Sequence, residues 1–357
     1  MFRVITTCDI SLPKKSTMCN HHITMSLTSQ LKDPNSPMGS LMVEHFNHGT
    51  DWADRYHEAL QSAQTSRPLA PAGARYDYPL IGTALTYLLP WEMEPKRSWL
   101  LEELSVPYQG FHLWRTLAFN EDLWTHTHRL RSSSARPQAG GESGLALLRD
   151  LTAATARLPK ADPEEKCRLA LFLGMLDHWF RSRAKAHERM YSTTATDGLD
   201  DILRRLKPEW VEDLMTLRGK FQESLPAGPT GKNVYFPTFA GSAAVGGADA
   251  DWITGKALID CKATIRPLMT TSELRQHVWQ LLGYAALDWD NEFKIKDVGL
   301  YMARQGTWVV WNGDDLCRQT SEWEVTSLEE LRELTEELLT DIDYGLNDEL
   351  EDQLAYQ

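Results

Sequence analysis

Three aspartates and one lysine are spaced so that two short antiparallel strands would gather their side chains. Asp249 and Asp251 precede a Gly-Lys dipeptide at 255–256, and Asp260 and Lys262 follow it. Glycine at the first central position suits a type II′ turn, so the segment predicts a hairpin in which Asp251 faces Asp260 and Asp249 faces Lys262. Directly opposed residues share one face of a sheet, and these four side chains should crowd one end of the hairpin.

The same register predicts the rest of the hairpin. Its pairs, counted outward from the turn, are Thr254 with Ala257, Ile253 with Leu258 and Trp252 with Ile259. Side chains alternate between the two faces of a strand. The face away from the acids would therefore carry four residues suited to packing on helices, namely Ala250, Trp252, Ile259 and Cys261.

Two carboxylates that face each other across a ladder destabilise it unless a cation compensates for their repulsion. The Asp249–Lys262 pair supplies one cation, which leaves excess negative charge beside Asp251 and Asp260. Such a site suits a hard divalent ion, Mg²⁺ or Mn²⁺, bound by oxygen ligands. A metal ion there would activate water and stabilise charge on a phosphate, and Lys262 would orient the water.

This arrangement resembles the PD-(D/E)XK nuclease superfamily. In that pattern an acid on one strand is followed, about ten residues later, by an acid-x-Lys triplet on the next strand. Asp251 matches the first acid, with Asp249 as an alternative, and Asp260-Cys261-Lys262 matches the triplet. The proline that usually precedes the first acid is absent.

A second motif lies on the helix expected over 271–288. Gln280 and Tyr284 are four residues apart and so share one helix face. They look like the Gln-x-x-x-Tyr motif of the branch that resembles the RecB exonuclease domain and Cas4-type nucleases. The resemblance covers roughly 235–311 and implies that both side chains support the site and contact the nucleic acid.

The resemblance also implies a fold and a ligand set. The fold class would be α/β, a restriction-endonuclease-like mixed sheet core flanked by helices, with a largely helical N-terminal region. The metal ligands would be Asp251 and Asp260, with Asp249 as helper and the backbone carbonyl of Cys261 as a further ligand. An additional upstream acid or histidine is left open among Glu209, Glu212, Asp213, Glu44 and His57.

Composition and patterning divide the chain into four parts. The expected parts are a disordered tail at 1–36, a helical region at 37–207 with a flexible loop at 131–144, a nuclease-like core at 208–326 and an acidic amphipathic helix at 327–357. A Ser-Leu-Glu-Glu capping box is expected to begin the last helix.

The net charge of −13 does not exclude a nucleic-acid partner, because the charge is unevenly placed. Residues 328–357 hold 11 acidic residues and one arginine, so the remaining chain is close to neutral and can present a local basic groove. Five cysteines in 357 residues and the lack of an evident signal peptide fit a cytoplasmic protein. No apolar stretch approaches a membrane span, so no membrane partner is expected.

The sequence therefore predicts a metal-dependent nuclease that hydrolyses phosphodiester bonds, with DNA as the expected partner and defence or repair as the role by analogy. One rival is a catalytically inactive nuclease-like module that binds nucleic acid or protein. Another is a nucleotide-sugar transferase using Asp249-Ala250-Asp251, which leaves Lys262 and Gln280 unexplained. Among nearby residues, Arg266 is expected to contact phosphate. His277 could reach the site or cap a groove, and a solvated polar role is the preferred interpretation.

Overall fold

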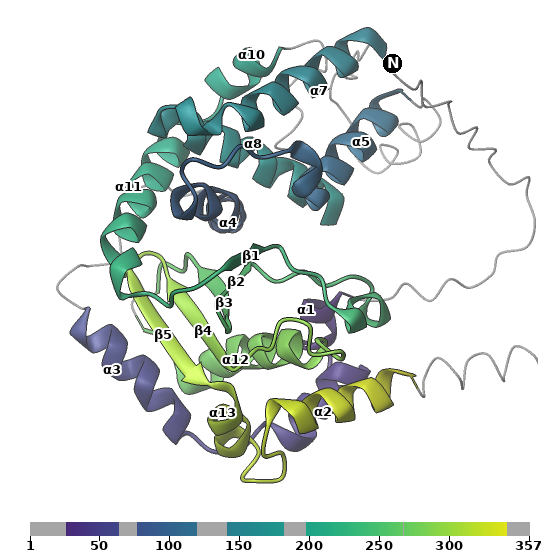
Figure 1. The fold of residues 1–357 in the computed structure, drawn as a ribbon, viewed down its shortest axis with the longest axis vertical. Helices are drawn as coiled ribbons and strands as arrows, with labels where there is room; N and C mark the ends of the chain where they lie inside the picture. Colours follow the sequence, from purple (N-terminus) through teal and green to yellow (C-terminus); the bar gives the residue numbers. More distant parts are fainter. Residues whose placement is uncertain (1–25, 64–76, 120–140, 182–197, 267, 341–357) are drawn as a thin grey trace, which may run out of the picture.

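The computed structural model describes residues 26–63, 77–119, 141–181, 198–266 and 268–340. These residues form a mixed α/β architecture in which one five-stranded sheet lies between two layers of helices (Figure 1). The strands are β1 Asn233–Tyr235, β2 Trp252–Thr254, β3 Ala257–Lys262, β4 Asp297–Met302 and β5 Thr307–Asn312.

The sheet has the order β1-β2-β3-β4-β5 and is antiparallel except at its centre. There β3 and β4 are parallel and are joined by helix α12, Thr271–Ala286. A parallel pair needs a crossover connection, and a helix is the usual one. This crossover places α12 beside the strand that carries Asp260 and Lys262.

The β2–β3 hairpin has the register predicted from the sequence. All three expected pairs are present: Thr254 with Ala257, Ile253 with Leu258 and Trp252 with Ile259. Gly255 has φ +61°, the left-handed conformation that glycine adopts without steric cost. The turn residue thus fixes the register of the strand that presents the acid-x-Lys triplet.

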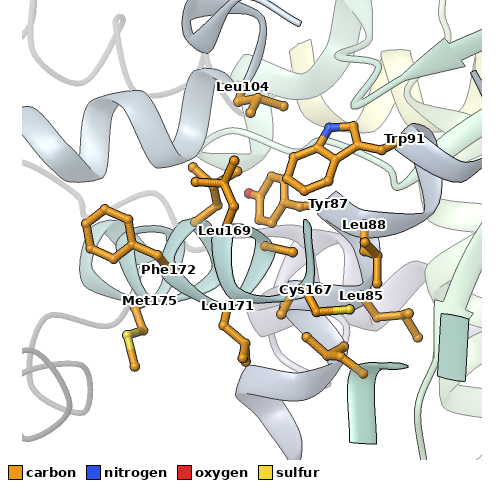
Figure 2. Close-up of a cluster of buried hydrophobic side chains, with 14 of the residues drawn as sticks. Leu85, Tyr87, Leu88, Trp91, Leu104, Cys167, Leu169, Leu171, Phe172 and Met175 are labelled. Carbon is orange, nitrogen blue, oxygen red and sulfur yellow. The ribbon is translucent and has the colours of Figure 1, made fainter. Parts of the chain in front are cut away.

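One face of the sheet shares a hydrophobic core with the helices α4 Tyr78–Met93, α5 Ser105–Phe119, α7 Gly141–Ala156, α8 Pro163–Arg181, α10 Leu199–Arg204 and α11 Pro208–Ser224. Figure 2 shows apolar side chains of α4 and α8 packed against each other. Gly174 lets these two helices approach, because a Cβ there would lie 3.1 Å from the Ala84 backbone nitrogen. Trp252, Ile259 and Cys261 of the hairpin belong to this core, as predicted.

The opposite face of the sheet packs on α12 and on helices from both ends of the described chain. These are α1 Leu27–Gln30, α2 Pro37–His45, α3 Asp54–Ser62, α13 Gly313–Thr320 and a helix over 328–340. Leu27 is buried against Gly283 of α12, and the Trp311 indole donates to the Trp52 carbonyl at 2.8 Å.

This packing corrects two expected boundaries. Residues 26–36 include α1 and bury Leu27 and Leu31, so this part of the expected tail is ordered, whereas 1–25 lies outside the described residues. Residues 37–62 do not join the other N-terminal helices but pack on the α12 side of the sheet. The helical N-terminal region is therefore split between the two layers.

The structure describes only part of two further expected segments, the loop at 131–144 and the acidic helix at 327–357. Residues 141–144 of the expected loop begin α7, and 131–140 lies outside the described residues. The C-terminal helix begins as expected, with the Ser327 hydroxyl accepting from the Glu330 backbone at 3.2 Å. The Glu330 carboxylate, however, binds the backbone of Thr326 rather than that of Ser327. Residues 341–357 lie outside the described part.

Within the described ranges, none of the helices combines the length and the apolar character that crossing a membrane requires.

Candidate functional site

A cavity of about 570 Å³ opens at the carboxyl end of β3, between α4 and α8 on one side and α12 on the other. The residues of the two nuclease-like motifs all line it: Asp249, Asp251, Asp260, Cys261, Lys262, Gln280 and Tyr284. The carboxyl end of a strand beside its crossover helix is a common place for ligands in α/β sheets. The structure thus gathers the predicted residues, although not in every predicted pairing.

Asp251 lies directly before the first residue of β2. Its carbonyl accepts from the Phe236 backbone at 3.0 Å, and its Oδ2 atom accepts from the Cys261 N–H at 2.6 Å. Burial raises the pKa of this carboxyl well above its usual range, and the nearby Asp260 carboxylate raises it further. Two carboxylates therefore meet at the cavity wall, as the sequence predicted, at a cost in electrostatic repulsion.

Lys262 links the carboxylates to helix α12. Its Nζ atom lies 2.6 Å from Asp260 Oδ2 and donates to Gln280 Oε1 at 2.9 Å. Gln280 Nε2 in turn donates to the Tyr284 hydroxyl at 3.2 Å, one helical turn along. Burial raises the pKa of Tyr284, which keeps its hydroxyl neutral. The predicted Gln-x-x-x-Tyr pair thus holds the ammonium group of Lys262 in place.

Asp249 does not pair with Lys262, which corrects the predicted hairpin face. The ladder between β2 and β3 ends at Trp252, and Asp249 forms a bridge with Thr238 instead. The Arg181 Nη2 atom of α8 lies 2.7 and 2.8 Å from its two carboxylate oxygens. Ala250, expected beside Trp252, packs in the core on the other side of the sheet for the same reason.

The Asp260 carboxylate has an oxygen that is engaged by an ion pair but by no hydrogen bond. Its Oδ2 atom is buried and close to the Lys262 ammonium, yet no donor meets it with hydrogen-bond geometry. Buried polar atoms are nearly always hydrogen-bonded, so an unsatisfied one beside a second carboxylate is a suitable metal ligand. Among the residues that the structure describes, no three Asp, Glu, His or Cys side chains converge as a metal group. Mg²⁺ commonly uses only one or two carboxylates and takes its other ligands from water and phosphate.

None of the candidate upstream residues lines the cavity. Asp213 is buried and receives two 2.8 Å hydrogen bonds from Arg304. The other candidates, Glu209, Glu212, Glu44 and His57, also lie outside the lining. Arg266 is exposed, pairs with Glu273 and does not line the cavity. The structure therefore gives no support to its expected phosphate contact.

The helical layer supplies a polar wall that the sequence reasoning missed. Asp177 accepts from the Tyr87 hydroxyl at 2.6 Å and from Arg181 Nε at 3.1 Å. Thr83 and His178 form a second contact of 2.9 Å between α4 and α8. The available signal was Asp177, a charged residue that follows the apolar run 169–176 and lies four residues before Arg181, because a buried acid needs a partner.

His277 lines the cavity instead of standing in solvent, which corrects the expectation for this residue. Burial lowers its pKa to about 3, and the positive charges of Lys262 and Lys32 add to the effect. The imidazole is therefore neutral at physiological pH and provides one donor and one acceptor to the cavity.

Comparisons with known proteins gave no match: no protein-family model, curated protein or solved structure matches the chain. The functional assignment therefore depends on the chemistry of the cavity.

Proposed function

We propose that the protein is a divalent-metal-dependent nuclease that hydrolyses phosphodiester bonds in DNA. The observation that carries this proposal is the meeting of Asp251 and Asp260 at a cavity wall, beside a lysine that Gln280 holds at 2.9 Å. Paired carboxylates with an adjacent fixed ammonium suit a reaction in which negative charge develops on a phosphate.

The topology supports a restriction-endonuclease-like core as the finer description of the fold. Helix α11 precedes three antiparallel strands, and the crossover helix α12 leads to β4, parallel to β3. Asp260 lies on β3 and Asp251 directly before β2, an arrangement in keeping with the resemblance drawn from the motifs.

Asp251, Asp260 and the backbone carbonyl of Cys261 would hold the metal ion, Mg²⁺ or Mn²⁺. The ion would supply Lewis-acid stabilisation of the phosphate and a lowered pKa for bound water. Asp249 joins this set only as a helper, because both of its oxygens are engaged by Arg181.

Lys262 would position the attacking water and stabilise the charge that develops on the phosphate. Its ammonium is held from two sides, by Asp260 and by Gln280, and its three donors leave capacity for water or substrate. Tyr284 acts through Gln280 and is a positioning residue.

The proposal is tested by incubating the protein with labelled single-stranded, linear duplex and supercoiled DNA at low salt in Mg²⁺, Mn²⁺ or EDTA. Cleavage that requires the metal supports a nuclease, and the ranking of substrates separates exonuclease from endonuclease action. DNA binding without cleavage of any substrate would instead support the inactive binding module.

Mg²⁺ is expected to raise the melting temperature of the wild-type protein and to leave that of Asp251→Asn unchanged. An ion that binds only the folded state stabilises it by about 1.4 kcal/mol at ten times its Kd. Without metal, the variant should melt above the wild type, because it removes one of two repelling carboxylates. Thermal unfolding in EDTA and over a Mg²⁺ titration measures both effects, and equal Mg²⁺ shifts in the two proteins would contradict the assignment of Asp251.

Filling the cavity from α4 is expected to block cleavage without unfolding the protein. A Cβ at Gly82 meets nothing within 4 Å, and phenylalanine is a better helix former than glycine. Gly82→Phe should therefore keep its melting temperature but lose about 100-fold in cleavage, a loss typical of a misplaced substrate. Gly219→Phe, on α11 and equally unobstructed, is the matched control. Undiminished cleavage by Gly82→Phe would place the substrate elsewhere.

A further inference from the structure

Arg181 joins the helical layer to the acid-rich edge of the cavity. It lies in the last described turn of α8 and contacts two carboxylates, Asp177 through Nε and Asp249 through Nη2. These contacts occupy the guanidinium along two of its edges and fix the orientation of its plane.

The third nitrogen of this guanidinium, Nη1, takes part in neither of these two contacts. Among the described residues no hydrogen bond or ion pair involves the Nη1 atom of Arg181, while 40% of the side chain is accessible and it lines the cavity. Arginine carries five N–H donors, so at least the two on Nη1 remain for a ligand. A fixed guanidinium with unused donors is well suited to phosphate oxygens.

A polyanion needs a cation with unused donors in this cavity, because the lining carries a net negative charge. Four aspartates and two permanent cations line it, a formal charge of −2 with both histidines counted as neutral. A single divalent ion would cancel this charge but leave no excess to attract a nucleic-acid backbone. Lys262 is already engaged by Asp260 and Gln280, so Arg181 is the cation in the described lining with the most unused donors.

We propose that Arg181 binds a non-bridging phosphate oxygen of the nucleic-acid backbone through Nη1, while Asp177 and Asp249 hold its guanidinium in place. The inference rests on the proposed function, because it takes a phosphodiester chain as the ligand. It assigns substrate positioning to a helix outside the segment that carries the nuclease-like motifs. In the competing view, Arg181 only neutralises the two aspartates.

Binding measurements separate these two roles without requiring cleavage. Fluorescence anisotropy with a labelled 20-nucleotide DNA, single-stranded or annealed to its complement, is recorded in Ca²⁺, and a gel checks that the DNA stays intact. The variants are Arg181→Met, the double variant Arg181→Met/Asp249→Asn, and Arg204→Met, which removes an exposed arginine that also pairs with an aspartate. Thermal unfolding confirms that each variant is folded.

We expect Arg181→Met to weaken binding by about 10-fold or more and to lower the slope of log Kd against log salt by about 1, because one phosphate contact is lost. The double variant should stay weak, although it carries no unpaired Asp249 charge, and Arg204→Met should bind like the wild type. Recovery of wild-type affinity by the double variant, an unchanged salt slope in Arg181→Met, or wild-type protein that binds no DNA would each overturn the inference. Failure of metal-dependent cleavage with Arg181-dependent binding intact would overturn only the proposed nuclease activity.

Discussion

Lys262→Ala is expected to lower the rate of DNA cleavage by about 100- to 1,000-fold, the usual loss when one preorganised charge-stabilising group is removed. The structure holds this ammonium against Asp260 and Gln280, so its position is set before substrate arrives. The variant also leaves two carboxylates without their nearest cation. Initial rates on the best DNA substrate in Mg²⁺ measure the loss.

Lys256→Ala is the matched control for this prediction. Lys256 lies in the turn of the same hairpin and is exposed, so its removal changes the net charge equally without touching the cavity. Its cleavage rate should stay within a factor of two or so of the wild type, in keeping with the small effect of surface substitutions. Cleavage by Lys262→Ala at the wild-type rate would show that the reaction does not use this site.

The hairpin was predictable because its geometry is local. Gly255 selects the turn, the turn sets the register, and the period of two then determines which side chains share a face. The prediction failed beyond Trp252, where Asp249 pairs with Thr238 rather than continuing the ladder. That pairing depends on a preceding segment of the chain, and nothing in the hairpin sequence signals where the ladder ends.

The division of the helices between two layers was not predictable from patterning. Periodicity shows that a helix has an apolar face but does not say which side of a sheet the face covers. Residues 27–62 pack beside α12 through contacts across more than 200 positions, such as the Trp279 indole with the Phe46 carbonyl at 2.9 Å. Arg181 was missed for the same reason, since its partner Asp249 is 68 residues away.

Asp213→Ala is expected to destabilise the fold by about 3–5 kcal/mol, the cost of leaving a buried charge without its partner. Asp213 and Arg304 are both buried and share two 2.8 Å hydrogen bonds. Arg304 also donates to the carbonyl of Ala263, the residue that follows Lys262. The Asp213–Arg304 pair therefore links α11 to the end of β3. The free energy of unfolding from urea titrations measures the loss.

Glu212→Ala, at the neighbouring position, is the control that shows whether Asp213 serves the fold or the catalytic site. Glu212 is exposed on the same helix, so its removal should change stability by less than about 0.5 kcal/mol. Both acids were candidates for the catalytic site from sequence, and the structure places both outside the cavity. A large stability loss in Asp213→Ala alone, with metal binding retained in both folded variants, would assign Asp213 to the fold. Equal stability of the two variants would contradict the buried pair, and loss of metal binding in folded Asp213→Ala would return this acid to the site.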